Sequence, residues 1–157
     1  MDFSQITEQL YMGTTPGPDD YEMLRGLGIQ LVINMRFLLG RPPSDRYSAV
    51  RYMRLRTADN RWWPIPAAVL MRGARAGLEV LLRGGKVYVH CSRGRHRSAA
   101  MAAAILIAEG RSPKEAMLLI KARRVAADPD ARHIEARIFE FARAWSQQKA
   151  VEAVLAR

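Results

Sequence analysis

Short apolar stretches in the first two thirds of the chain constrain the fold most strongly. The run IQLVIN at 29–34 and the run KVYVH at 86–90 are rich in β-branched residues, as buried strands are. Residues 50–57, VRYMRLRT, alternate between apolar and polar side chains, which is typical of a half-buried strand. These three stretches predict three strands of one sheet.

Helical patterns separate the predicted strands. Residues 17–29 indicate a helix that begins near Pro18 and Asp19 and closes at Gly28, directly before the first apolar run. Residues 67–82 show helical periodicity up to a Gly-Gly pair. The stretches FLLGRPPSD and ADNRWWPIP are interrupted by proline and predict loops.

Only helical patterns follow Ser98. Residues 99–109 are an apolar helix, and a last helix is predicted over about 130–147. Between them SPKE predicts a helix start, with a serine N-cap, a proline in the first turn and a glutamate capping-box partner. We therefore expect an α/β fold, with a small, mostly parallel central sheet flanked by helices.

Length and composition suit one globular domain over residues 1–157. The chain has 49% hydrophobic and 25% charged residues, the balance of a packed domain. Its longest apolar run, 99–108, is too short to span a membrane, and the polar start MDFSQITEQLYMG lacks the apolar core of a secretory signal. We expect no transmembrane segment and a cytoplasmic location.

The net charge of +10 favours anionic partners: phosphorylated molecules, nucleic acid or an anionic membrane surface. Two arginine clusters would suit RNA, but a solvated basic face is the commoner explanation and no RNA-binding motif accompanies them. Nucleic acid is therefore not the expected partner. The clusters are Arg51, Arg54, Arg56 and Arg61, and Arg123 with Arg124.

The only cysteine, Cys91, lies in VYVHCSRGRHRS at 87–98. One cysteine forms no internal disulfide, and three scattered histidines with one cysteine lack the ligand spacing of a structural zinc site. The Gly-rich nucleotide loop that ends in Gly-Lys-Ser/Thr is absent from the sequence. We expect neither a metal nor another cofactor.

The surroundings of Cys91 predict a nucleophile that faces an anion. A loop from a strand into a helix N-terminus turns its backbone N–H groups inward and binds phosphate. The same positive field should lower the pKa of the Cys91 thiol. Arg97 would grip two phosphate oxygens and stabilise the transition state, and Ser98 would donate a hydrogen bond to the thiolate.

The remaining loop residues have supporting roles. We expect His90 to orient the loop through backbone hydrogen bonds, and the side chains of Arg93, Arg95 and His96 to point outward to the rim. The phosphate-binding residues are predicted to be Ser92, Arg93, Gly94, Arg95, His96 and Arg97.

Two plainer interpretations of the loop exist. Cys91 could be a small core residue, but the flanking arginines argue against a purely structural thiol. The loop could also bind phosphate without catalysis, against which stands the presence of a cysteine, an arginine, a serine and an aspartate together.

The pattern H90-C91-x-x-G94-x-x-R97-S98 resembles the signature of cysteine-dependent phosphatases of the small dual-specificity type, in the protein tyrosine phosphatase superfamily. The resemblance covers about 6–145 and leaves a C-terminal helical tail, 146–157. It implies a central sheet with flanking helices, attack by Cys91, a phosphocysteine intermediate and hydrolysis without a metal. Further stretches that carry it are LYMG, GIQLVINMR, SPKEAMLLIKARR and DPDARHIEARIFEF.

Such a mechanism needs an acid that protonates the leaving oxygen and then, as a base, activates water. Asp59 is the candidate, because it lies in the loop where the family places its aspartic acid. Asp45 is the weaker candidate, and the plain alternative for Asp59 is an aspartate that caps a turn. Trp62 and Trp63 could form a lid, although packing of their loop onto the domain is the favoured interpretation.

The substrate class follows from the resemblance. Chain length favours phosphotyrosine and phosphoserine/threonine proteins, and the basic side chains of the loop point second to phosphoinositides or phosphatidylglycerophosphate. An RNA 5′-phosphate is a third alternative. Because no second cysteine is present, peroxide should convert Cys91 to a sulfenic acid or sulfenamide.

Overall fold

A five-stranded sheet forms the centre of the computed structural model, which describes residues 1–38, 40, 42–44 and 49–157. The strand order is β1-β2-β5-β3-β4; β1 is antiparallel to β2, and the other pairs are parallel. The strands are β1 (Phe3–Gln5), β2 (Leu10–Gly13), β3 (Ile29–Asn34), β4 (Arg51–Arg54) and β5 (Lys86–His90). Strand β5 is therefore central, and Val89 lies opposite Met12 on one side and Ile33 on the other.

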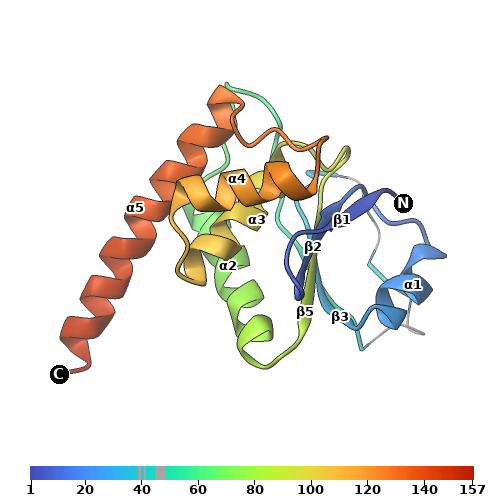
Figure 1. The fold of residues 1–157 in the computed structure, drawn as a ribbon, viewed down its shortest axis with the longest axis horizontal. Coiled ribbons are helices and arrows are strands. Elements are labelled where there is room, and N and C mark those ends of the chain that lie inside the picture. Colours follow the sequence, from blue (N-terminus) through green and yellow to red (C-terminus); the bar gives the residue numbers. More distant parts are fainter. Residues whose placement is uncertain (39, 41, 45–48) are drawn as a thin grey trace.

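Helices cover both faces of this sheet. Helix α1 lies on one face, and α2 to α5 lie on the other (Figure 1). The helices are α1 (Asp20–Gly26), α2 (Ala67–Leu82), α3 (Arg97–Ala108), α4 (Pro113–Arg123) and α5 (Arg132–Leu155). None of the helices in the described ranges is long and apolar enough to pass through a membrane.

Alternate side chains of the strands pack into two separate apolar clusters. Leu31 and Ile33 belong to the larger cluster, beneath α2 to α5, whereas Val32 joins the smaller cluster with Leu24 of α1. A strand that is buried on both faces reads as a continuous apolar run, which is why 29–34 and 86–90 were recognisable.

Small residues allow α3 to lie deep in the larger cluster. Helix α3 is buried from Ser98 to Ile107 and is rich in alanine. Two glycines of α2 face it: a Cβ on Gly73 would lie 2.4 Å from Met101 Cε, and one on Gly77 would lie 2.8 Å from Ile105 Cδ1. The two glycines therefore allow α2 and α3 to pack closely against each other.

The predicted α/β class and the mostly parallel sheet are confirmed, and so is the capping box that begins α4. Three details differ. Strands β1 and β2 were not predicted, because runs of three and four residues show too little periodicity. Strand β4 ends at Arg54, and α5 continues to Leu155, since no glycine or proline follows Gln147.

Candidate active site

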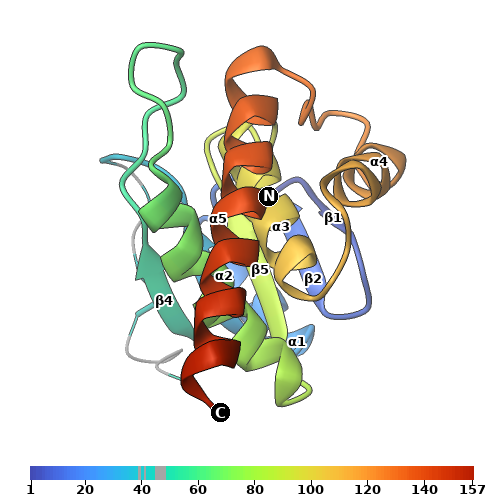
Figure 2. The same cartoon turned by 90° about the vertical axis from the view of Figure 1, so that its left-hand side faces the viewer.

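The 91–96 loop joins the carboxyl end of β5 to the first residue of α3. The 58–66 loop and the start of α5 lie at the same edge of the sheet (Figure 2). Ligands of parallel α/β sheets bind at this edge, because the connections that leave the strand ends converge there.

Gly94 gives the 91–96 loop its shape. Its φ of +60° is left-handed, and a Cβ at this position would lie 2.6 Å from the carbonyl carbon and oxygen of Gly13, at the end of β2. Only glycine permits both the conformation and the close approach.

Cys91 lies at the floor of a cavity of about 350 Å³, although only 2% of its surface is exposed. Burial alone would raise the pKa of its thiol. Hydrogen bonds from the Ser98 hydroxyl and from the backbone N–H groups of Ser98 and Arg95, with the charge of Arg97, outweigh burial and lower this pKa below its ordinary value. The distance from Cys91 Sγ to Ser98 Oγ is 3.3 Å. The other lining residues are Asp59, Ser92, Arg93, Arg95, His96, Arg97 and His133.

Two backbone carbonyl groups hold the Arg97 side chain in place. Its Nη1 donates to the carbonyls of Met35 and Thr57, at 3.2 and 2.9 Å. Its Nε is buried and has no hydrogen-bond partner among the described residues; the Asp59 carboxylate lies 3.8 Å away. An anion in the cavity would accept a hydrogen bond from this Nε–H group. This agrees with the phosphate-binding role that the sequence predicts for Arg97.

Asp59 extends from the 58–66 loop over the cavity. One of its carboxylate oxygens lies 3.1 Å from His96 Nδ1 and 3.1 Å from His133 Nε2. A mere turn-capping aspartate would not be held over a buried thiol by two side chains from other elements. His133 was not singled out from the sequence, because it lies 42 positions beyond Cys91 and only the fold brings it here.

The loop side chains divide into two groups. Ser92, Arg93 and Arg95 are exposed at the rim, and Arg95 pairs with Asp128 at 3.1 Å. His96 differs from the expectation of an outward side chain: it is half-buried and turned to Asp59, since the carboxylate offers it a hydrogen bond that water would otherwise supply.

His90 is buried, and neither ring nitrogen makes a hydrogen bond of normal geometry within the described ranges. The ring stacks on Tyr88, with ring centroids 5.9 Å apart, and the orienting role expected of His90 stays a prediction. Burial lowers the pKa of His90 to about 3, so the imidazole is neutral but too weakly basic to accept a proton in the reaction.

Arg124 was assigned to an exposed basic cluster, and that interpretation is wrong. Its side chain is 3% exposed and donates from Nε to the Gly94 carbonyl at 2.8 Å, and from Nη2 to Asp2 Oδ2 at 2.8 Å. A buried guanidinium is stable here because carbonyl and carboxylate oxygens neutralise it. Arg124 thus ties the 91–96 loop to the N-terminal segment.

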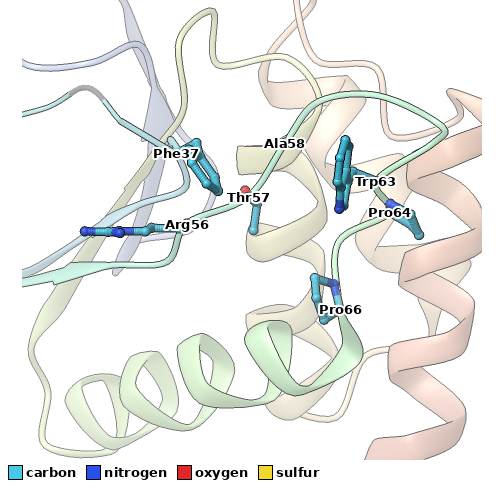
Figure 3. A pocket seen from close by; sticks show the side chains of 7 residues that line it. All are labelled: Phe37, Arg56, Thr57, Ala58, Trp63, Pro64 and Pro66. Carbon is cyan, nitrogen blue, oxygen red and sulfur yellow. The ribbon is translucent and has the colours of Figure 1, made fainter.

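A second, apolar pocket of about 410 Å³ borders the site (Figure 3). The rings of Phe37 and Trp63 stand on opposite sides of it, with Thr57 and Ala58 between them.

Trp62 and Trp63 are 77% and 75% exposed, so the prediction that this loop packs onto the domain is wrong. The Asn60 side chain holds the turn by accepting from both backbone N–H groups, which leaves the rings in solvent. Asp45 lies outside the described residues.

Fold and site together define a cysteine-dependent phosphatase. The dual specificity phosphatase catalytic domain model matches residues 10–143, and the chain belongs to this family. The chain is 29% identical to mouse dual specificity phosphatase 28 over 133 residues, which cover 82% of this chain and 77% of that protein.

Two further relatives are similar. Mouse phosphatidylglycerophosphatase and protein-tyrosine phosphatase 1 is 40% identical over 83 residues, 52% of this chain and 42% of that protein. A crystal structure of a human DUSP28 variant shares the fold with a TM-score of 0.83 at 23% identity, over 94% of this chain and 99% of that one.

Proposed function

We propose that this enzyme removes phosphate from phosphotyrosine and phosphoserine/threonine in proteins through a phosphocysteine on Cys91. The observation that carries the proposal is the cavity itself. It places a thiol of lowered pKa, the free donor of Arg97 and the carboxyl of Asp59 around one space.

The first step breaks the ester bond. The Cys91 thiolate attacks phosphorus, the P–O bond to the substrate breaks, and Asp59 gives its proton to the leaving oxygen. The Arg97 guanidinium and the backbone N–H groups of the 91–96 loop bind the equatorial oxygens, where charge accumulates in the transition state.

The second step regenerates the enzyme. Water gives a proton to Asp59 and attacks the phosphocysteine, the S–P bond breaks, and inorganic phosphate leaves. The Ser98 hydroxyl stabilises the departing thiolate by the hydrogen bond that already joins it to Sγ.

The apolar pocket between Phe37 and Trp63 supports a protein substrate, since it could bind a side chain beside the phosphorylated residue (Figure 3). The similarity to mouse dual specificity phosphatase 28, over most of both chains, points the same way. A nucleophilic thiol also needs reducing surroundings, which supports a cytoplasmic location.

A phospholipid or inositol phosphate is the second candidate substrate. Trp62, Trp63 and Leu38 are exposed, and Arg61 lies over the Trp62 ring at 4.6 Å, a combination that suits a lipid headgroup region. The partial similarity to a phosphatidylglycerophosphatase also favours this candidate.

Turnover of matched substrates distinguishes a protein substrate from a phospholipid or inositol phosphate. Phosphotyrosine and phosphoserine peptides, phosphatidylglycerophosphate, phosphoinositides and 5′-phosphorylated RNA are compared at one ionic strength. Higher kcat/KM on peptides is expected, and activity confined to lipids or RNA would reject the protein substrate.

Cys91→Ser should abolish turnover and retain phosphate binding; a serine variant that still hydrolyses para-nitrophenyl phosphate would contradict the role of Cys91.

A further inference from the structure

Three side chains from three separate elements meet at the mouth of the cavity. Asp59 comes from the 58–66 loop, His96 is the last residue before α3, and His133 is the second residue of α5. One nitrogen of each imidazole and one carboxylate oxygen all lie within 4.8 Å of one another. The imidazole rings meet edge to face, with centroids 5.2 Å apart and an interplanar angle of 80°.

Two imidazole nitrogens and one carboxylate oxygen form a ligand set that Zn²⁺ takes in open sites, with a fourth position left for solvent or substrate. Bonds of about 2.1 Å in a tetrahedron place neighbouring ligand atoms about 3.4 Å apart. The distances of 3.1 Å from the Asp59 oxygen to each histidine nitrogen are close to this spacing. A metal ion could therefore take the place of the protons in the hydrogen bonds of Asp59 with His96 and His133, with only small side-chain movements.

The surroundings of this cluster both favour and oppose a cation. The Asp128 carboxylate lies 3.8 Å from His96 Nε2, the nitrogen that does not face Asp59; this distance is too long for a hydrogen bond, but the negative charge favours a cation nearby. The Arg97 Nε lies 3.8 Å from Asp59, and Arg95 pairs with Asp128, so both positive charges reduce the affinity. Imidazole ligands select zinc and related transition metals over Mg²⁺.

We propose that Asp59, His96 and His133 bind one Zn²⁺ ion, and that the bound ion reversibly inhibits the enzyme. Metal binding is argued from the geometry alone. Inhibition rests on the proposed function, because a carboxylate that coordinates zinc cannot carry the proton of the leaving group.

Titration with Co²⁺, which reports tetrahedral coordination by visible absorption, tests the binding. Cys91→Ser protein without any histidine tag is used, so that the thiolate, a strong zinc ligand by itself, is absent. One Co²⁺ per chain that Zn²⁺ displaces is expected. If the wild-type protein binds Co²⁺ and Cys91→Ser does not, the metal sits on the sulfur and the proposal is overturned.

Single variants identify the ligands. His96→Asn and His133→Asn, each in the Cys91→Ser background, should weaken Co²⁺ binding by at least about 10- to 100-fold, the loss found even for residues that only support a ligand. Asp130→Asn is the matched control, since Asp130 pairs with Lys121 and lies outside the cluster; its affinity should stay unchanged. Both histidines are half-buried at the surface, and a melting curve checks that each variant folds. Equal affinity in all variants would overturn the site.

Turnover of the wild-type enzyme in the presence of Zn²⁺ tests the proposed inhibition. Turnover of para-nitrophenyl phosphate should fall on addition of Zn²⁺ and recover with EDTA, and it should need higher Zn²⁺ concentrations in His133→Asn. Binding without inhibition would reject the inhibitory role while leaving the metal site in place. Absence of any turnover would reject the proposed function, and the Co²⁺ titration would still decide the site.

Discussion

The buried hydroxyl of Ser98 is the strongest single influence that favours the ionised form of Cys91. The sulfur is almost fully enclosed, and enclosure by itself favours the neutral thiol. The Ser98 hydroxyl, 3.3 Å away, favours the charged form, with help from backbone N–H groups and Arg97. The thiolate therefore depends on a short list of donors rather than on the net positive charge of the molecule.

Replacement of Ser98 by alanine should raise the pKa of the Cys91 thiol. A hydrogen bond to a charged group is worth about 1.5–3 kcal/mol, so the thiolate fraction below the pKa should fall about tenfold or more. The pH profile of iodoacetamide alkylation measures this, and its midpoint should move to higher pH. Ser92→Ala, with an exposed side chain, serves as the control. An unmoved midpoint in Ser98→Ala would show that the backbone and Arg97 suffice.

Replacement of Asp59 by asparagine should slow poor leaving groups more than good ones. Without a proton donor, alkyl phosphates such as phosphoserine should lose about 100-fold or more in kcat, whereas activated aryl phosphates lose less. A series of substrates of increasing leaving-group pKa, compared with Asp130→Asn, measures the difference. Equal slowing across the series would contradict the role of Asp59 as an acid.

At the scale of elements, the 91–96 loop depends on contact between two backbones. Gly94 approaches Gly13, so β2 limits the position of the loop that leaves β5. The sequence indicated a glycine in the middle of the loop but not what it contacts, because β2 was not recognised as a strand. Strand pairing across 77 positions leaves no local signal in the sequence.

Replacement of Gly94 by alanine should distort this loop. The left-handed φ costs about 1–3 kcal/mol for a residue with a side chain, before the contact with Gly13 is counted. We expect a lower Tm and a loss of most turnover. Gly26→Ala is the matched control, because Gly26 is helical and no atom lies near the new Cβ. This variant should have a free energy of unfolding about 0.4–1 kcal/mol higher than the wild type. Normal turnover in Gly94→Ala would show that the loop tolerates another shape.

At the scale of the whole molecule, the last turns of α5 lie outside the packed domain. Trp145 is the last buried residue, and residues 149–157 are exposed. The C-terminal end of α5 extends away from the other elements (Figure 1). An ion pair of Glu152 with Arg75 joins this end of the helix to α2, and both of its side chains are half exposed. Such pairs contribute at most about 1 kcal/mol.

Truncation after Gln148 should therefore leave the enzyme folded and active. Loss of the Glu152 pair should lower Tm by no more than about 4 °C for a chain of this size, with unchanged kcat/KM. Differential scanning calorimetry and size-exclusion chromatography give the answer. A large drop in Tm or a changed elution volume would show that the exposed apolar side chains of this tail, including Val151 and Leu155, form an interface.

Sequence reasoning reached those features whose causes are local. The apolar runs, the capping box of α4 and the pattern around Cys91 each occupy a short stretch. It did not reach Arg124 or His133, because their roles depend on elements that meet only in three dimensions. Three histidines that look scattered along the chain include two that share one carboxylate.

The contact of Arg124 with Gly94 also has a consequence for biosynthesis. The signature motif leaves the ribosome well before the guanidinium that braces it, and His133 follows later still. A nascent chain that ends before α4 holds every residue of the motif yet lacks the brace. Catalytic competence should therefore arise late in translation, when α4 and α5 dock onto α2 and α3.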